Sequence, residues 1–386
     1  MKNKFELEAI RISYILNNAC NLYCKHCFEN SEYRHGVQLT IEDALKATQF
    51  VITHNTNTSK EIEITFIGGE PVLYNKFIEF KKCFDLLFEN GYSIKILRIY
   101  TNGTAYPEEL IELLDYISEK GYRDKILFVT TKDFLNNSPM RIDIHGNSMN
   151  DVIDKNMELL RQHGYEVFVQ YVFGKHDVKN YPRILEEIYK NEDIDFDYAY
   201  PCNPDSDLNE DDFNFMIDEL YKFTRNHETD YDFYRRCGME LLFCIANDIE
   251  FYYEEPRDSI HCNPIKGEFS ISPKGYVIPC VKLIEKENEF SHLKIDEITK
   301  NPDLLFKNKQ LLNIISYEDK NEEGQKCREC IFYNFCHRCR LHTTLIDFNQ
   351  DKHIEHHKHQ CERIFTFCRC VLNKLKEYKE WQTQKY

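Results

Sequence analysis

The first 200 residues alternate between short apolar runs and longer segments in which apolar side chains recur with a helical period. The short runs, rich in β-branched and aromatic residues, predict strands, and the amphipathic segments between them predict helices that cover a sheet. The expected strands are 11–16, 61–67, 93–100, a region within 125–146, 166–173 and 195–200. The expected helices are 40–52, 75–91, 107–121, 149–164 and 181–189.

Local signals mark the ends of two of these helices. Thr40 and Asp43 form a capping-box-like pair at the start of the first helix, and Gly91 ends the second. Cys83 lies near the apolar stripe of the second helix, so we expect a small buried core residue there.

Alternation of strands and helices predicts an α/β fold with a parallel sheet, here a partial (β/α)6 TIM-like barrel whose chemistry sits at the carboxyl ends of the strands. The alternation stops near residue 201, and 207–236 has the pattern of acidic helices. We expect a barrel at 1–200, a helical connector at 201–255 and a smaller cysteine-rich domain at 256–386. Residues 132–140 fit neither pattern and are interpreted as an insertion.

Sixteen cysteines are the main anomaly of the composition. The chain shows no export signal and no apolar run of membrane-spanning length, so we expect a cytoplasmic protein that does not act in a membrane. In a reducing compartment the cysteines favour metal or redox chemistry over disulfides. The net charge of -16 argues against a nucleic-acid partner.

Three of the cysteines, Cys20, Cys24 and Cys27, follow the first strand in a C-x3-C-x2-C pattern. Three thiolates can hold an iron-sulfur cluster with one open iron, whereas a closed zinc site needs a fourth ligand, for which His26 is nearest. Polar segments also follow the next strands, at Gly68-Gly69-Glu70-Pro71, at 101–104 and at 143–146. They predict that polar residues at the carboxyl ends of the strands form the rim of a ligand-binding site.

The cysteine loop with Phe28 directly after it, the GGEP segment and the strand-helix alternation together resemble a radical S-adenosylmethionine (radical SAM) enzyme over residues 9–200. The resemblance implies that the three cysteines hold a four-iron four-sulfur cluster whose open iron binds the amino and carboxylate groups of S-adenosylmethionine. One electron then splits the cofactor and yields a 5'-deoxyadenosyl radical that abstracts hydrogen from a substrate. Glu70 would contact the methionyl amino group, Phe28 the adenine, and Asp143 the ribose unless it is an ordinary strand-end carboxylate. The full set of implied cofactor contacts is Phe28, Gly68, Gly69, Glu70, Pro71, Thr101, Asn102 and Asp143.

The last third of the chain carries cysteines in short paired spacings. A hairpin turning at 273–275 separates Cys262 from Cys280, and the later cysteines are Cys327, Cys330, Cys336, Cys339 and Cys361. Such spacings also allow zinc ribbons. Their order resembles the auxiliary-cluster domain called SPASM over residues 256–375, which implies three four-iron four-sulfur clusters in the whole chain.

By that resemblance an outer cluster is held by Cys327, Cys330, Cys336 and Cys361, and an inner one by Cys262, Cys280 and Cys339. Only two residues separate Cys336 from Cys339, where the family usually has three. The fourth inner ligand is either Cys244 or Cys237, or the inner cluster has an open iron that binds a substrate thiolate. Outside the pattern remain Cys368 and Cys370 in FCRC, of which at least one is expected to be structural or exposed, the histidines of 353–359, and Cys202, a candidate acid or thiol on the rim.

The resemblance implies a peptide-modifying enzyme that forms a thioether or a related cross-link on a short ribosomal precursor peptide. Sulfatase-maturing relatives carry an aspartate after the second hairpin cysteine, and here that position is Val281. Implied partners are an electron donor such as flavodoxin or ferredoxin and, unless the enzyme's own surface binds the leader, a separate leader-recognition protein. The alternatives are a sulfatase-type maturase, a small-molecule radical dehydrogenase and a non-catalytic zinc-binding adaptor.

Overall fold

The computed structural model describes residues 4–24, 27, 36–133, 140–191, 194–198, 208–237, 239, 242–243, 266–315 and 365–374. Several residues singled out from the sequence lie outside these ranges. They are His26, Phe28, Cys202, Cys244, Cys262, Cys327, Cys330, Cys336, Cys339, Cys361 and the segment 353–359.

The described strands form a sheet with the hydrogen-bonded order β6-β5-β4-β3-β2-β1-β7-β8. The pairings β1·β2, β2·β3, β3·β4, β5·β6 and β1·β7 are parallel, and β7·β8 is antiparallel. This confirms the predicted α/β class with a parallel sheet. The strands are β1 (Arg11–Ile15), β2 (Glu61–Ile67), β3 (Ser93–Thr101), β4 (Ile126–Asp133), β5 (Glu166–Phe173), β6 (Ile194–Tyr198), β7 (Glu268–Ile271) and β8 (Val277–Ile278).

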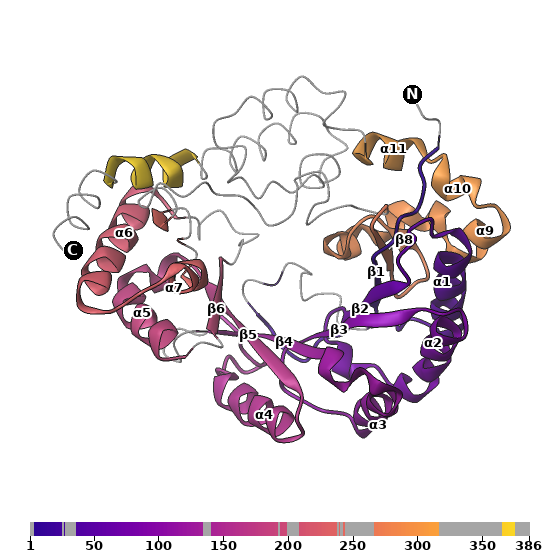
Figure 1. Cartoon of the computed structure of the whole chain (residues 1–386), viewed down its shortest axis with the longest axis horizontal. Helices are drawn as coiled ribbons and strands as arrows, with labels where there is room; N and C mark the ends of the chain where they lie inside the picture. The colour runs from indigo at the N-terminus through magenta and orange to yellow at the C-terminus, as the bar shows by residue number, and fades with distance from the viewer. Residues whose placement is uncertain are drawn as a thin grey trace. The chain divides into compact units, whose positions relative to one another are not determined.

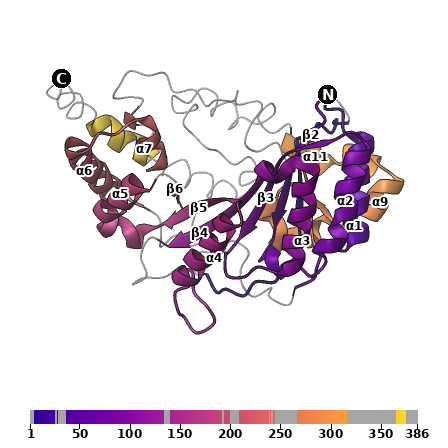
Figure 2. The same ribbon diagram turned by 60° about the horizontal axis from the view of Figure 1, so that its bottom comes forward.

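Helices follow the strands in the expected order, and α1, α2 and α3 lie along the outer side of β1, β2 and β3 (Figures 1 and 2). Among the described residues, none of the helices is both long enough and apolar enough to cross a membrane. The helices are α1 (Ile41–His54), α2 (Phe77–Glu89), α3 (Glu108–Ile117), α4 (Asn150–Gln162), α5 (Tyr181–Lys190), α6 (Glu210–Asn226), α7 (Tyr231–Arg236), α9 (Ile295–Lys300), α10 (Asp303–Phe306) and α11 (Lys309–Ile315).

Both helix ends that were predicted from local signals are confirmed. Thr40 caps α1 by accepting a hydrogen bond from the main-chain N–H of Asp43 at 3.0 Å. Gly91 follows the end of α2 with a φ of 79°, a left-handed conformation that glycine adopts without strain. Cys83 is buried on α2, as expected for a core thiol.

The chain divides into two compact units, which differ from the predicted domain boundaries. The hairpin of β7 and β8 belongs to the first unit, because β7 adds a parallel strand to the open edge of β1 and satisfies its backbone hydrogen bonds. The first unit is Met1–Lys132, Pro139–Phe168 and Cys262–Ser316. The second unit is Asp133–Ser138, Val169–His261 and Tyr317–Tyr386.

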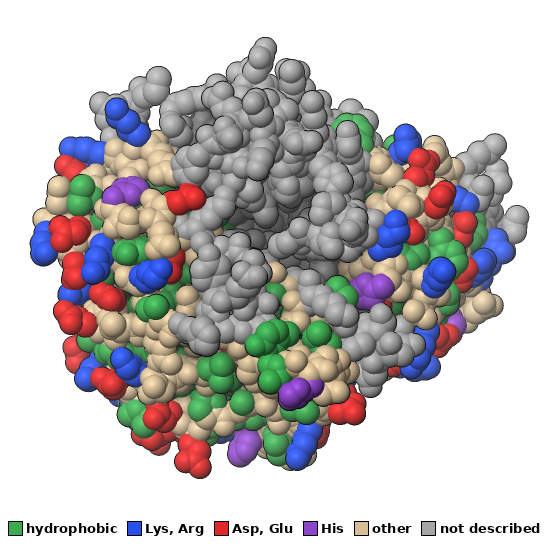
Figure 3. Space-filling model, turned by 180° about the vertical axis from the view of Figure 1, so that it is seen from behind, with side chains coloured by type: hydrophobic (Ala, Val, Ile, Leu, Met, Phe, Trp, Pro, Cys, Tyr) green, Lys and Arg blue, Asp and Glu red, His purple; other side chains and the backbone are tan. Residues whose placement is uncertain are grey.

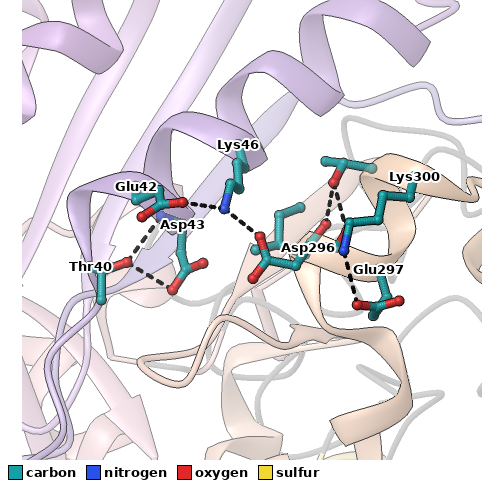
Figure 4. Close-up of polar contacts among 9 residues, drawn as sticks. Thr40, Glu42, Asp43, Lys46, Asp296, Glu297 and Lys300 are labelled. Atoms are coloured by element: carbon teal, nitrogen blue, oxygen red, sulfur yellow. Dashed lines mark hydrogen bonds and ion pairs between the residues drawn. The ribbon is translucent and has the colours of Figure 1, made fainter.

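Side-chain ion pairs tie the hairpin region to the start of α1 within the first unit (Figure 4). Lys46 of α1 pairs with Asp296 of α9 and with Glu42 one helical turn away. Gly275, in the hairpin turn, lies so close to Asp43 that an added Cβ would meet the carboxyl carbon at 2.9 Å. The turn predicted at 273–275 is confirmed, and it packs against the helix that follows the cysteine loop.

In the second unit, the acidic helices predicted to form a connector belong to a hydrophobic core. The buried face of α6 includes Met216, Ile217 and Leu220, which share this core with α5. Cys237, Cys368 and Cys370 lie in the same core. Both cysteines of FCRC are therefore structural: Cys370 directs its thiol toward the main-chain oxygen of Glu210, 3.8 Å away.

The fourth strand ends earlier than predicted. β4 stops at Asp133, and 143–146 forms a tight turn instead of a strand end. The Asp143 carboxylate accepts the main-chain N–H of His145 at 2.8 Å and that of Asn147 at 2.9 Å, which folds the backbone back on itself. The local side-chain hydrogen bonds prevail over the alternation of apolar residues that predicted a strand.

A charged network lies on β1, β2 and β3. Glu63 accepts hydrogen bonds from Arg11 at 2.6 Å and from Arg98 at 2.6 Å, and pairs with Lys95 at 3.3 Å. Burial acts to raise the pKa of Glu63, but the hydrogen bonds and charges of Arg11 and Arg98 outweigh it and hold the pKa at about 2, below its ordinary 4.5. The ionised form of Glu63 therefore stabilises the folded state.

Replacing Glu63 with glutamine is expected to lower the free energy of unfolding by about 3 kcal/mol at neutral pH. Because the folded-state pKa is depressed, this contribution is full above pH 4.5 and disappears as the pH falls toward about 2. Urea unfolding of wild type and Glu63→Gln across this range measures the difference. Glu61→Gln, an exposed change on the same strand, should shift stability by less than about 0.5 kcal/mol. An equal difference between wild type and Glu63→Gln at every pH would contradict the assignment.

Candidate active site

The GGEP segment lies directly against the backbone that leads into the cysteine loop. The N–H of Gly69 donates to the oxygen of Asn17 at 3.0 Å, and the N–H of Glu70 donates to the oxygen of Ala19 at 2.7 Å. A Cβ at Gly68 would lie 2.2 Å from the Asn17 oxygen, and one at Gly69 would lie 2.4 Å from the Ala19 oxygen. The two glycines are therefore required so that the two strand ends can touch.

The carboxylate of Glu70 is fully buried and organises the neighbouring strand end. It accepts hydrogen bonds from the Thr101 hydroxyl at 2.7 Å, the Asn102 N–H at 2.5 Å and the Val72 N–H at 3.1 Å. Burial raises the pKa of Glu70 to about 6, although these hydrogen bonds oppose the shift. Pro71, also buried, begins the short helical turn that follows. Glu70 thus links the ends of β2 and β3.

Asn102 connects this carboxylate to the first cysteine. Its main-chain N–H donates to Glu70, while its side-chain N–H contacts the Cys20 sulfur at 3.7 Å and donates to Asn21 at 2.7 Å. The N–H of Leu22 also donates to the Cys20 sulfur, at 3.4 Å. The predicted rim residues Glu70, Thr101 and Asn102 are therefore brought together with Cys20 by direct hydrogen bonds.

The three cysteines of the loop are partly exposed and are not in disulfides. Burial, followed by the Glu70 carboxylate, raises the pKa of Cys20 to about 11. Across the described ranges, no group of three or more His, Cys, Asp or Glu side chains is arranged to hold a metal ion. The chemistry of the donor set still fits an iron-sulfur cluster, because Cys20 already receives the N–H hydrogen bonds that cluster sulfurs accept.

Asp143 lies in a turn ten residues after the end of β4, and the oxygen of the preceding Ile142 accepts a hydrogen bond from the N–H of Tyr23 in the cysteine loop at 2.7 Å. Its carboxylate is exposed, and the hydrogen bonds from Asn147 and His145 lower its pKa, as in an ordinary turn. The other reading of this residue, as an ordinary carboxylate, accounts for all of these contacts. A role of Asp143 toward the ribose stays a prediction.

Two residues of the site were missed from the sequence. Asn17 is fully buried and donates from its side chain to the Glu70 main-chain oxygen at 2.9 Å, which fastens the GGEP turn to the cysteine loop. Arg141 is buried, donates to the Thr131 hydroxyl, and its charge lowers the pKa of Glu70. Asn17 could have been found as the polar residue between an apolar strand and the first cysteine, but no local pattern marks Arg141.

The hairpin brings one further predicted ligand into the first unit. Cys280 follows β8 as a partly exposed cysteine that is not in a disulfide, and Val281 begins the next helical turn. The other predicted ligands of the auxiliary clusters, apart from the buried Cys237, lie outside the described residues.

Comparison with known proteins identifies relatives of this chain. The Radical SAM superfamily profile matches residues 14–188. The radical SAM cyclopropyl synthase TigE of Paramaledivibacter caminithermalis is 24% identical over 294 residues, which cover 71% of this chain and 57% of TigE. The sporulation killing factor maturation protein SkfB of Bacillus subtilis is 29% identical over 102 residues, covering 26% of this chain and 22% of SkfB. The chain thus matches little more than half the length of TigE, and less than a quarter of SkfB.

Solved structures share the fold. Native anSMEcpe with bound AdoMet and Cp18Cys peptide superposes with a TM-score of 0.61 at 17% identity, covering 95% of this chain and 99% of that one. SuiB of Streptococcus suis superposes with a TM-score of 0.53 at 15% identity, covering 85% of this chain and 72% of SuiB. The matched region begins in β1 and holds the cysteine loop, the GGEP turn and the strand ends that they join. Residues 14–188 therefore match a radical SAM domain, and over this region the chain is similar to radical SAM proteins.

Proposed function

We propose that this chain is a radical SAM peptide-modifying enzyme of the SPASM type, which abstracts hydrogen from a ribosomally made peptide and forms a thioether or related cross-link. The observation that carries the proposal is the hydrogen-bonded chain from Cys20 through Asn102 to Glu70, which joins the cysteine loop to the GGEP turn. TigE and SkfB are named as a cyclopropyl synthase and a maturation protein, and anSMEcpe binds AdoMet and a peptide, which supports this class.

Within the site, Cys20, Cys24 and Cys27 would hold the cluster. When bound, the cluster and S-adenosylmethionine supply a radical that abstracts hydrogen. A carboxylate offers about four acceptor positions, and protein donors use three of those on Glu70, so one remains for an amino group of a ligand. Arg141, whose charge already acts on Glu70, is the matching cation for the carboxylate of the same ligand.

The remaining assignments rest on the family resemblance. Phe28 is proposed to contact the adenine, Cys280 with Cys262 and Cys339 to hold an inner cluster, and Cys327, Cys330, Cys336 and Cys361 to hold an outer one. Cys202 stays a candidate at the rim. The proposed partners are a precursor peptide, a leader-recognition protein and an electron donor of the flavodoxin or ferredoxin kind.

The substrate class is tested by co-expression. The chain is produced without oxygen together with any short cysteine-rich peptide encoded beside its gene, and the peptide mass is measured. The proposal predicts the loss of one pair of hydrogen atoms per bond formed, with a cysteine blocked against alkylation. Activation of a co-expressed sulfatase, with the peptide unchanged, would overturn the cross-linking function in favour of sulfatase maturation.

A further inference from the structure

The inner face of the sheet in the first unit is polar, in contrast to its outer face. Tyr14 and Phe66 point outward, where both contact Phe80 of α2, and Phe269 contacts Phe50 of α1. Since side chains alternate along a strand, the residues between them face the opposite way. These inward residues are Arg11 and Ser13 of β1, Glu63 and Thr65 of β2, and Glu268 and Ser270 of β7.

These inward side chains form two levels. The strand register aligns Arg11 with Glu63 and Glu268, and aligns Ser13 with Thr65 and Ser270 one step closer to the carboxyl ends. A TIM barrel whose interior is a packed core fills such levels with branched apolar side chains. The hydroxyl and charged side chains at these two levels instead indicate that the inner face of the sheet binds a polar ligand.

The two carboxylates of the lower level, Glu63 and Glu268, are surrounded by three cations. Arg11 lies at the same level, Lys95 pairs with Glu63, and Arg98 reaches Glu63 from one step closer to the carboxyl ends. Glu268 is further engaged by the Ser13 hydroxyl at 2.6 Å. On the face drawn in Figure 3, by contrast, acidic and basic side chains of the described residues are interspersed.

Arg98 is the cation with unused hydrogen-bonding capacity. It aligns with Thr65, at the hydroxyl level, and its Nη1 donates to Glu63 at 2.6 Å. That is its one hydrogen bond to the described residues, and its side chain is 23% exposed. A guanidinium has five N–H groups in a planar fork, so the Nε and Nη2 side can receive a carboxylate bidentately.

Arg98 is aligned with Thr65, which lies three residues before Gly68. At about 3.3 Å per residue, Arg98 therefore lies roughly 10 Å along the strands from the GGEP turn. That spacing leaves room for one peptide residue between the turn and the guanidinium. We propose that Arg98 binds a carboxylate of the peptide substrate on the inner face of the sheet, and so selects a substrate with an acidic side chain or a free C-terminus. This inference rests on the proposed function.

The test uses three small probes on the anoxic holoprotein, with binding followed by ligand-observed NMR. N-acetylglutamate α-amide carries a side-chain carboxylate, N-acetylglutamine carries a C-terminal one, and N-acetylglutamine amide carries neither. One of the acids is expected to bind in the millimolar range, at least about tenfold more tightly than the amide, and the acid that binds identifies the source of the carboxylate. Equal binding of all three probes would overturn the proposal.

Arg98→Lys keeps the positive charge beside Glu63 but removes the planar fork, and is expected to weaken binding of the acid by about tenfold. Its thermal unfolding midpoint should stay close to that of wild type, which separates lost recognition from lost folding. Lys82→Gln removes an exposed cation from α2 and should bind the probes as wild type does. Wild-type affinity in Arg98→Lys would overturn the assignment to Arg98. 5'-Deoxyadenosine formation by wild type is measured in parallel, because its absence would instead refute the proposed function.

Discussion

Replacing Cys20, Cys24 or Cys27 with alanine is expected to lower 5'-deoxyadenosine formation by more than about a hundredfold. Even partners that only orient a metal ligand are worth about 10- to 100-fold, and the loss of a ligand should cost more. The structure adds a reason for the first position, because Cys20 receives hydrogen bonds from Leu22 and Asn102 that no alanine accepts. The measurement is chromatographic detection of 5'-deoxyadenosine from S-adenosylmethionine under strong reduction without oxygen.

A matched control is Cys83→Ala, which removes a thiol buried on α2. It should retain turnover and cost about 1 kcal/mol or more of stability for the lost packing. Undiminished 5'-deoxyadenosine formation in any of the three loop variants would refute the assigned cluster site.

Glu70→Gln is expected to have the second largest effect, a loss of about 10- to 100-fold in 5'-deoxyadenosine formation together with about 1–3 kcal/mol of stability. A carboxamide keeps one acceptor oxygen. With that oxygen facing the Thr101 hydroxyl and the Val72 N–H, its NH2 group would face the Asn102 N–H, which then has no acceptor. The displaced Asn102 would no longer hold Asn21 and the Cys20 thiol. Turnover and urea unfolding are measured on the same preparation.

The exposed variant Glu61→Gln, earlier on the same strand, should match wild type in both measurements. Glu70→Gln with unchanged turnover and unchanged stability would show that the buried carboxylate does not organise the site.

The parts of the site that follow in sequence from a strand end were predictable, because parallel strands put their carboxyl ends at one edge. Cys20, Glu70 and Thr101 were expected on one rim, and hydrogen bonds connect them there. Gly68 and Gly69 were expected to allow a close approach to a ligand. In the structure it is the Asn17 and Ala19 backbone that approaches them, and this contact could not be predicted from the local sequence.

Other features could not be predicted because they depend on contacts that the local sequence pattern does not show. The hairpin was predicted, yet its parallel pairing with β1 depends on an edge left open by a segment more than 250 residues away. The 143–146 turn escaped prediction because side-chain hydrogen bonds of Asp143 compete with a strand-like apolar alternation. The excess of cations around Glu63 and Glu268 arises from residues of four strands, β1, β2, β3 and β7, and cannot be seen in the sequence of any one of them.

The most direct test is the electron paramagnetic resonance spectrum of the anoxically purified, reduced protein before and after addition of S-adenosylmethionine. A cluster held by three cysteines has an open iron that the cofactor can bind, so the spectrum should change on addition. The protein should be brown and contain about twelve irons if three four-iron clusters are present. A colourless protein with stoichiometric zinc, or a cluster signal that S-adenosylmethionine leaves unchanged, would contradict the account.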